Sequence, residues 1–143
     1  MKAEELMLGD WVFYDCEPVR IGRISDISPS EEHIMVCNAL EGTFPASPEK
    51  LQPIPITTEI LQKNGFRYDP TDTAGLEYYS LGDLGKETLT VVKKTGLDAF
   101  EDMDNGQIVW SVYADIDIYD KVVYIHELQH ALHMSHINKE ITI

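Results

Sequence analysis

The stretch NGQIVWSVYADI, residues 105–116, contains the clearest indication of the fold. Asn105-Gly106 is a dipeptide that strongly favours a two-residue hairpin turn, because that turn needs positive φ at both positions. After the turn, every second residue is apolar, which is typical of a strand with one buried face. The residues expected to share that face are Ile108, Trp110, Val112, Ala114 and Ile116. The stretch therefore predicts an antiparallel sheet.

The residues on either side of this hairpin extend the prediction to a whole α+β domain. Short runs of β-branched and aromatic residues predict a four-stranded antiparallel meander over 76–81, 88–94, 99–103 and 107–116. A long helix is expected over residues 118–135, capped by Asp117, because Ile125, Leu128 and Leu132 recur at helical spacing. Residues 139–143 predict a short final strand.

The N-terminal third of the chain predicts a second, smaller β unit. Short strands are expected over 11–14, 20–27, 33–37, 41–45 and 51–54, and their number and length indicate a small SH3-like β-barrel. Pro53 and Pro55 mark the junction, since proline supplies no donor to a sheet ladder. A short helix capped by Thr57 and ended by Asn64-Gly65 follows. The expected domains are residues 1–55 and 56–143.

The charge of the chain argues against two classes of partner. Eleven Lys and Arg residues oppose 25 Asp and Glu residues, giving a formal net charge of −14, with −6 before the junction and −8 after it. Nucleic acids and anionic membranes bind clustered basic residues, so neither is expected to bind. An acidic surface that mimics nucleic acid is an alternative function consistent with this charge.

The N-terminus and the cysteines predict a cytoplasmic location. No run approaches the roughly 18 apolar residues of a spanning helix, and no secretory signal is visible. Cys16 and Cys37 are too few for a disulfide framework and have no zinc-type spacing, so both are expected to be small buried hydrophobes.

The predicted C-terminal helix contains the most specific motif, His126-Glu127-Leu128-Gln129-His130. An HExxH helix can direct two imidazoles at one zinc ion, with the glutamate as general base. His136 stands where metzincins place a third histidine, so His126, His130 and His136 are candidate ligands and Glu127 the candidate base. The metzincin pattern needs glycine at the position of His133, however, and this departure weighs against a catalytic zinc site.

The simpler interpretation of these histidines is structural. His126, His130 and His133 recur on the side of the predicted helix opposite its apolar residues, as expected for a polar, solvent-facing stripe. On this interpretation the protein has no catalytic residues and no cofactor, and zinc belongs only to the alternative of a zincin-type hydrolase.

Aromatic residues supply a second, weaker candidate for a site. Trp11, Tyr14, Tyr78, Tyr79 and Tyr113 all fall in predicted strands. Most are expected in the cores or on sheet faces, and a few of them could line a peptide-binding groove.

Three segments resemble a known group of proteins: GDWVFY (9–14), LQPIPITTEILQKNGF (51–66) and VVYIHELQHAL (122–132). The group consists of uncharacterised proteins common in Bacteroides-type gut bacteria and their phages and mobile elements. The GDWV opening is also similar to small SH3-like and KOW-like barrels, which bind peptides, proteins or nucleic acid. The resemblance implies a cytosolic bacterial protein of prophage or mobile-element origin. Together with the charge, it predicts a non-enzymatic protein that binds or assembles with another protein.

Overall fold

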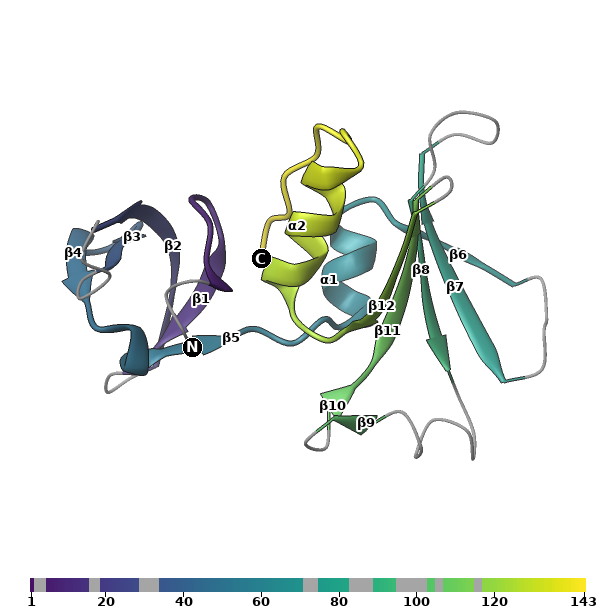
Figure 1. The fold of residues 1–143 in the computed structure, drawn as a ribbon, viewed down its shortest axis with the longest axis horizontal. Coiled ribbons are helices and arrows are strands. Elements are labelled where there is room, and N and C mark those ends of the chain that lie inside the picture. The colour runs from purple at the N-terminus through teal and green to yellow at the C-terminus, as the bar shows by residue number, and fades with distance from the viewer. Residues whose placement is uncertain are drawn as a thin grey trace. The chain divides into compact units, whose positions relative to one another are not determined.

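The computed structural model describes residues 1, 5–15, 19–28, 34–70, 75–82, 89–94, 103–104, 107–114 and 117–143. Contacts divide the chain into two compact units, unit 1 (Met1–Ile54) and unit 2 (Pro55–Ile143). Each unit contains an antiparallel sheet of five strands, and two helices lie on one face of the unit 2 sheet (Figure 1). The chain is thus a mostly-β α+β protein, which confirms the α+β part of the predicted fold class.

Unit 1 is an antiparallel meander in the order β4-β3-β2-β1-β5. Its elements are β1 (Trp11–Tyr14), β2 (Arg20–Ile27), β3 (Ile34–Asn38), β4 (Gly42–Ala46), the 3₁₀ turn η2 (Pro48–Lys50) and β5 (Leu51–Pro53). Each strand lies within one residue of its predicted bounds. Among the described residues β4 and β5 remain the two end strands of this order, so the structure does not show the closed barrel that was expected.

The unit 1 sheet curves around a small apolar core. Val12, Ile24 and Val36 are at most 2% exposed, and each comes from a different strand of the meander. Gly22 in β2 allows the neighbouring strand to approach closely, because a Cβ atom there would lie 2.3 Å from Cγ1 of Val36. Only glycine fits at this position without a shift of the core.

Unit 2 has the sheet order β12-β11-β8-β7-β6, and a separate two-stranded hairpin, β9-β10, lies outside that sheet. The elements are α1 (Thr58–Lys63), β6 (Arg67–Asp69), β7 (Leu76–Leu81), β8 (Leu89–Lys94), β9 (Met103–Asp104), β10 (Gln107–Ile108), β11 (Trp110–Ala114), β12 (Asp117–Val122) and α2 (Ile125–Met134). The predicted strand over 76–81 is confirmed. Asn105-Gly106 lies outside the described residues, but Gln107 pairs with Asp104 across it.

Two predictions about the unit 2 sheet are wrong. The main sheet has five strands, not four, because β6 and β12 form its edges and β8 pairs directly with β11. The long helix begins at Ile125, not at residue 118, since residues 117–122 form an edge strand in which Ile118 pairs with Tyr113. Pairing with β11 satisfies backbone groups that a helix would otherwise satisfy internally.

The C-terminus also differs from its prediction, because residues 139–143 form no strand. Ile141 is only 1% exposed, and Thr142 is bound by the side chain of Asn64 at the end of α1. That helix follows its prediction: the Thr57 side chain accepts a hydrogen bond from the Ile60 N–H at 3.3 Å. The Asn64 side chain and the burial of Ile141 therefore hold residues that were expected to form a strand.

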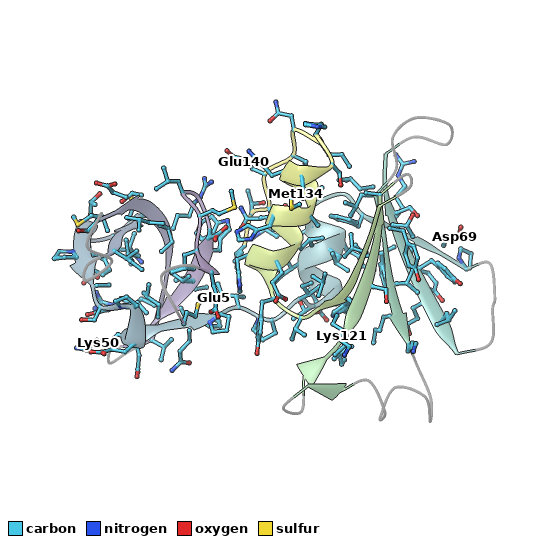
Figure 2. The ribbon with its side chains drawn as sticks, in the orientation of Figure 1. Glu5, Lys50, Asp69, Lys121, Met134 and Glu140 are labelled. Atoms are coloured by element: carbon cyan, nitrogen blue, oxygen red, sulfur yellow. The ribbon has the colours of Figure 1, made fainter. Side chains whose placement is uncertain are left out.

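Successive residues of the unit 2 strands point to opposite faces of the sheet, so every second side chain belongs to the same face. Tyr79, Val91 and Val112 are at most 3% exposed and belong to the core, together with Leu61 of α1 and Leu128 of α2. The intervening residues of β7, β8 and β11 project from the other face. Asp69 of β6 and Met134 of α2 mark the two sides of the sheet in Figure 2. One face is covered by the two helices, whereas no described element of unit 2 covers the other, which is called the open face below.

Candidate functional site

The glutamate of the HExxH motif has a structural function at the start of α2. Glu127 Oε2 accepts hydrogen bonds from the backbone N–H groups of Val123 at 2.7 Å and Tyr124 at 3.0 Å. Tyr124 is the N-cap residue and Glu127 is at position N3, so this carboxylate caps the helix as in a capping box. A carboxylate committed to these N–H groups is poorly placed to act as a general base.

The histidines of the motif do not form the solvent-facing stripe that was expected. His126 is only 6% exposed; its ring stacks on Tyr124 at 5.8 Å and meets the edge of the His130 ring at 5.7 Å. His130 is half-buried, and only His133 of the three is exposed. The prediction is wrong for His126, which a helical wheel assigns to solvent but whose ring stacks on Tyr124, in the segment that enters the helix.

His136, the candidate third ligand, instead ends the helix. Its φ of 57° is left-handed, and the Ile137 N–H donates to the Leu132 carbonyl at 2.9 Å. The His136 N–H donates to the His133 carbonyl at 3.1 Å, so the two bonds form a Schellman motif with His136 in the place usually taken by glycine. Within the described residues, no group of three His, Cys, Asp or Glu side chains could hold a metal ion.

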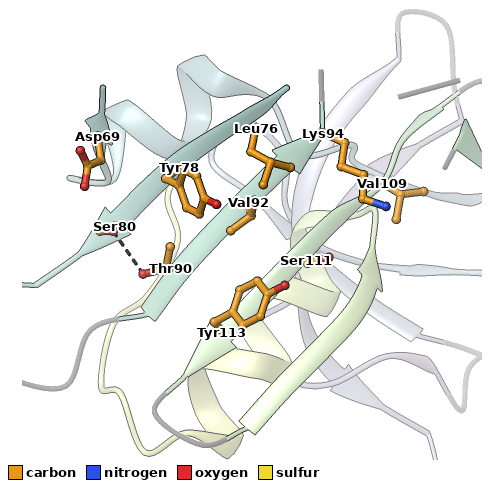
Figure 3. A pocket seen from close by; sticks show the side chains of 10 residues that line it. All are labelled: Asp69, Leu76, Tyr78, Ser80, Thr90, Val92, Lys94, Val109, Ser111 and Tyr113. Atoms are coloured by element: carbon orange, nitrogen blue, oxygen red, sulfur yellow. Dashed lines mark hydrogen bonds between the residues drawn. The ribbon is translucent and has the colours of Figure 1, made fainter. Parts of the chain in front are cut away.

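The open face of the unit 2 sheet contains a cavity of about 710 Å³, the sheet-face cavity (Figure 3). Its size falls within the range of about 300–1,000 Å³ that is typical of ligand sites. Strands β6, β7, β8 and β11 and the residue before β11 supply the lining, which consists of Asp69, Leu76, Tyr78, Ser80, Thr90, Val92, Lys94, Val109, Ser111 and Tyr113. The cavity is thus built from one continuous surface of a hydrogen-bonded sheet.

Strand register orders this lining into rows. Val92 pairs with Tyr78 on one side and with Ser111 on the other, and it lies at the centre with only 6% exposure. In the next row Thr90 pairs with Ser80 and Tyr113, and the Ser80 and Thr90 hydroxyls lie 3.1 Å apart. The result is an apolar floor surrounded by hydroxyl groups.

The two charged groups of the lining lie toward its rim. Asp69 is on the edge strand β6, and Lys94 is the last residue of β8; both are exposed. Among the described residues, the lining contains no histidine or cysteine, and its other polar side chains carry hydroxyl groups. This set of side chains can hold a ligand by apolar contact and hydrogen bonding.

The aromatic residues named from the sequence separate into two groups. Tyr78 and Tyr113 line the sheet-face cavity, whereas Tyr79 is a core residue on the opposite face, 3% exposed. The Tyr79 hydroxyl donates to Glu77 Oε2 at 3.0 Å, and burial raises the pKa of this tyrosine above 10.0. In unit 1, Trp11 lies under the Arg23 guanidinium at 5.4 Å, and Tyr14 packs on Phe44.

The serine and threonine residues of the cavity were missed by the sequence reasoning. The signal was present in β11, where Ser111 and Tyr113 alternate with the buried residues Trp110 and Val112. That alternation places half-buried Ser111 and exposed Tyr113 on the outer face of a central strand. The cysteine prediction is also corrected: Cys37 is exposed on β3, and Cys16 lies outside the described residues.

Comparison with known proteins assigns no family. No protein-family profile, curated protein or solved structure matches the chain. Among the described residues, neither helix is long and apolar enough to cross a membrane. Function must therefore be argued from the geometry of the two candidate sites.

Proposed function

We propose that the protein is a non-enzymatic binding protein that holds a segment of another protein in the sheet-face cavity. The observation that carries this proposal is the lining itself: two accessible tyrosines and several hydroxyl groups surround a buried apolar floor. Tyrosine is enriched at protein interfaces because it offers a large rigid contact area and a polar tip. The lining has the composition of an interface and lacks the groups of a catalytic centre.

The form of the site supports an extended segment as the occupant. Its floor is a sheet surface at least four strands wide, which corresponds to about 14 Å between β6 and β11. A peptide of four or five extended residues spans such a distance. Hydroxyl groups along the rows offer donors and acceptors to the backbone of that peptide.

The alternative of a zinc hydrolase has less support. Its base would be Glu127, whose carboxylate is bound to two backbone N–H groups of its own helix. Its third ligand would be His136, which lies beyond the helix end in a left-handed turn. A catalytic zinc site needs three protein ligands and an open position, and only His126 and His130 lie near each other.

We extend the proposal to unit 1 as an SH3-like module in a prophage or mobile-element protein. The meander order, in which β5 returns to pair with β1, supports this assignment. At the GDWV opening, Gly9 has a φ of 92°, and Asp10 closes the turn by accepting the Met7 N–H at 2.7 Å. The prophage origin rests on the sequence resemblance alone.

Selection from a random-peptide phage library tests the binding function. Peptides enriched on the wild-type protein are expected to lose binding when Ser111→Trp fills the cavity. Gln62→Trp, which adds the same side chain at an exposed position of α1, should leave binding intact. Circular dichroism verifies that both variants are folded. If Ser111→Trp does not fold, Tyr113→Ala repeats the test by removing an exposed ring from the lining. Enrichment of no peptide, or equal binding to the cavity variant, contradicts the proposal.

A further inference from the structure

We propose that the segment bound in the sheet-face cavity is basic, with lysine or arginine side chains against the rings of Tyr78 and Tyr113. This inference rests on the proposed function, because it specifies the partner for the same site. Two independent observations lead to it: the position of the two rings and the charge of the unit that forms the cavity.

Both rings can be reached from solvent. Tyr113 is 41% exposed and Tyr78 is half-buried, and they come from strands on either side of β8 (Figure 3). The face of a tyrosine ring attracts ammonium and guanidinium groups. Unit 2 already contains this interaction on its other sheet face, where Lys93 Nζ lies 5.8 Å from the centre of the Trp110 ring.

The register sets the spacing that a ligand must match. Tyr78 pairs with Val92 and Tyr113 pairs with Thr90, so the tyrosines are two strands and two residues apart. Standard strand spacing and rise place their Cα atoms about 12 Å from each other. An extended peptide advances about 13 Å in four residues, and residues i and i+4 project from the same side. Basic residues at these two positions can therefore reach both rings.

The charge of unit 2 favours a cationic occupant. Residues 56–143 contain 15 acidic and seven basic residues. The segments that connect the strands of the sheet, 70–75, 82–88, 95–102 and 115–116, together contain seven acidic residues and one basic residue. An excess of negative charge raises the association rate of a positively charged partner and disfavours negatively charged partners.

The positive charge of Lys94 repels a basic ligand, but Lys94 lies away from the positions of the two tyrosines. It is paired with Leu76, whereas Val92 and Thr90, which pair with the tyrosines, are two and four residues back along β8. The carboxylate of Asp69, which is paired with Tyr78, lies at the other side of the lining. The proposal therefore expects Lys94→Gln to strengthen binding of a basic peptide by about twofold, since it removes one like charge.

Matched peptides isolate the charge of the ligand. The probes are three capped peptides of about nine residues, identical except that positions 3 and 7 are arginine, citrulline or glutamate. Citrulline has the shape of arginine without its charge. Affinity is measured by fluorescence anisotropy at about 0.15 M salt to screen long-range attraction, and NMR amide shifts of Thr90 and Ser111 identify the site.

The arginine peptide is expected to bind about tenfold more tightly than the citrulline peptide, as two exposed cation–π contacts would give. Replacing both tyrosines by leucine should abolish this preference, whereas replacing both by phenylalanine should retain it. Tyr68→Leu is the matched control, because Tyr68 is an exposed tyrosine of the same sheet outside the lining.

Three results would overturn the inference: equal binding of the arginine and citrulline peptides, a preference that persists in the double leucine variant, or no saturable binding of any probe. The library selection described above decides the proposed function separately. If neutral peptides are enriched there and lost with Ser111→Trp, the binding function stands and only the basic character of the partner is wrong.

Discussion

Asn64 should contribute strongly to the stability of unit 2, because its buried side chain joins α1 to the C-terminal residues. It is 3% exposed and lies at the C-terminal end of α1, and its side chain binds a residue 78 positions away. Its Nδ2 donates to the carbonyls of Ile60 at 2.8 Å and Thr142 at 2.7 Å, while its Oδ1 accepts the Thr142 N–H at 2.8 Å. The Thr142 hydroxyl also donates a hydrogen bond to Asn64 Oδ1 at 3.2 Å.

The expected cost of Asn64→Ala follows from these contacts. Each of the three short bonds contributes about 1 kcal/mol net, and the longer hydroxyl bond contributes less. The sum is about 3 kcal/mol, a value moderated because the exposed Thr142 can be hydrated once it is released. The variant also frees Ile141, which is 1% exposed, from the core of unit 2.

The assay uses the two tryptophans of the chain, one in each unit. In a Trp11→Phe background, the fluorescence of the buried Trp110 reports the unfolding of unit 2 alone. Urea titration then gives the free energy of unfolding with and without Asn64→Ala. Asn38→Ala is the matched control: this half-buried asparagine of unit 1 binds the backbones of Ile21 and Leu40, and its replacement should leave the Trp110 transition unchanged.

A double-mutant cycle tests the cause of the effect. Deleting residues 141–143 removes the partner of Asn64, so Asn64→Ala in the shortened chain should cost about 1 kcal/mol or less, the value of the remaining bond to Ile60. The reasoning is refuted if Asn64→Ala costs less than about 1 kcal/mol in the full chain. It is also refuted if the cost is the same in both chains.

Three further predictions concern α2 and the core. His136→Gly should raise the free energy of unfolding of unit 2 by about 0.5–1 kcal/mol, because glycine adopts the left-handed φ of 57° without strain; a loss of stability in urea titration would contradict this. Glu127→Ala should lower it by about 1–2 kcal/mol through the loss of the cap, and Glu127→Gln by less, since the amide oxygen can still accept; equal effects of the two variants would argue against capping. Burial raises the pKa of Tyr79, so its stabilising contribution is complete below pH 10 and is lost as the pH rises through the folded-state value. The alkaline loss of stability should therefore be smaller in Tyr79→Phe than in the wild type, and identical pH profiles would refute the assignment.

The sequence by itself determined most of the strands and the short helix. Trp11–Tyr14, Arg20–Ile27 and Leu76–Leu81 were predicted to the residue from β-branched and aromatic runs between turn residues. Thr57 and Gly65, which has a φ of 84°, mark the ends of α1 through capping chemistry that acts within a few residues. These features depend on local backbone preferences, which can be predicted from the residues of one short segment.

Other features were decided only by tertiary structure. Residues 117–122 form a strand because they pair with β11, and His126 is buried with its ring stacked on Tyr124. In both cases a neighbour outside the local pattern determines the outcome.

The same limit applies to the candidate site. The sequence named five aromatic residues of which a few could line a groove, without distinguishing Tyr78 and Tyr113 from the others. The position of these two tyrosines beside Ser80, Thr90 and Ser111 depends on the register of three strands. Register is fixed by side-chain packing between segments that are distant in the chain. Sequence periodicity reveals which residues share a face of one strand, whereas the cavity exists only where several strands place those faces side by side.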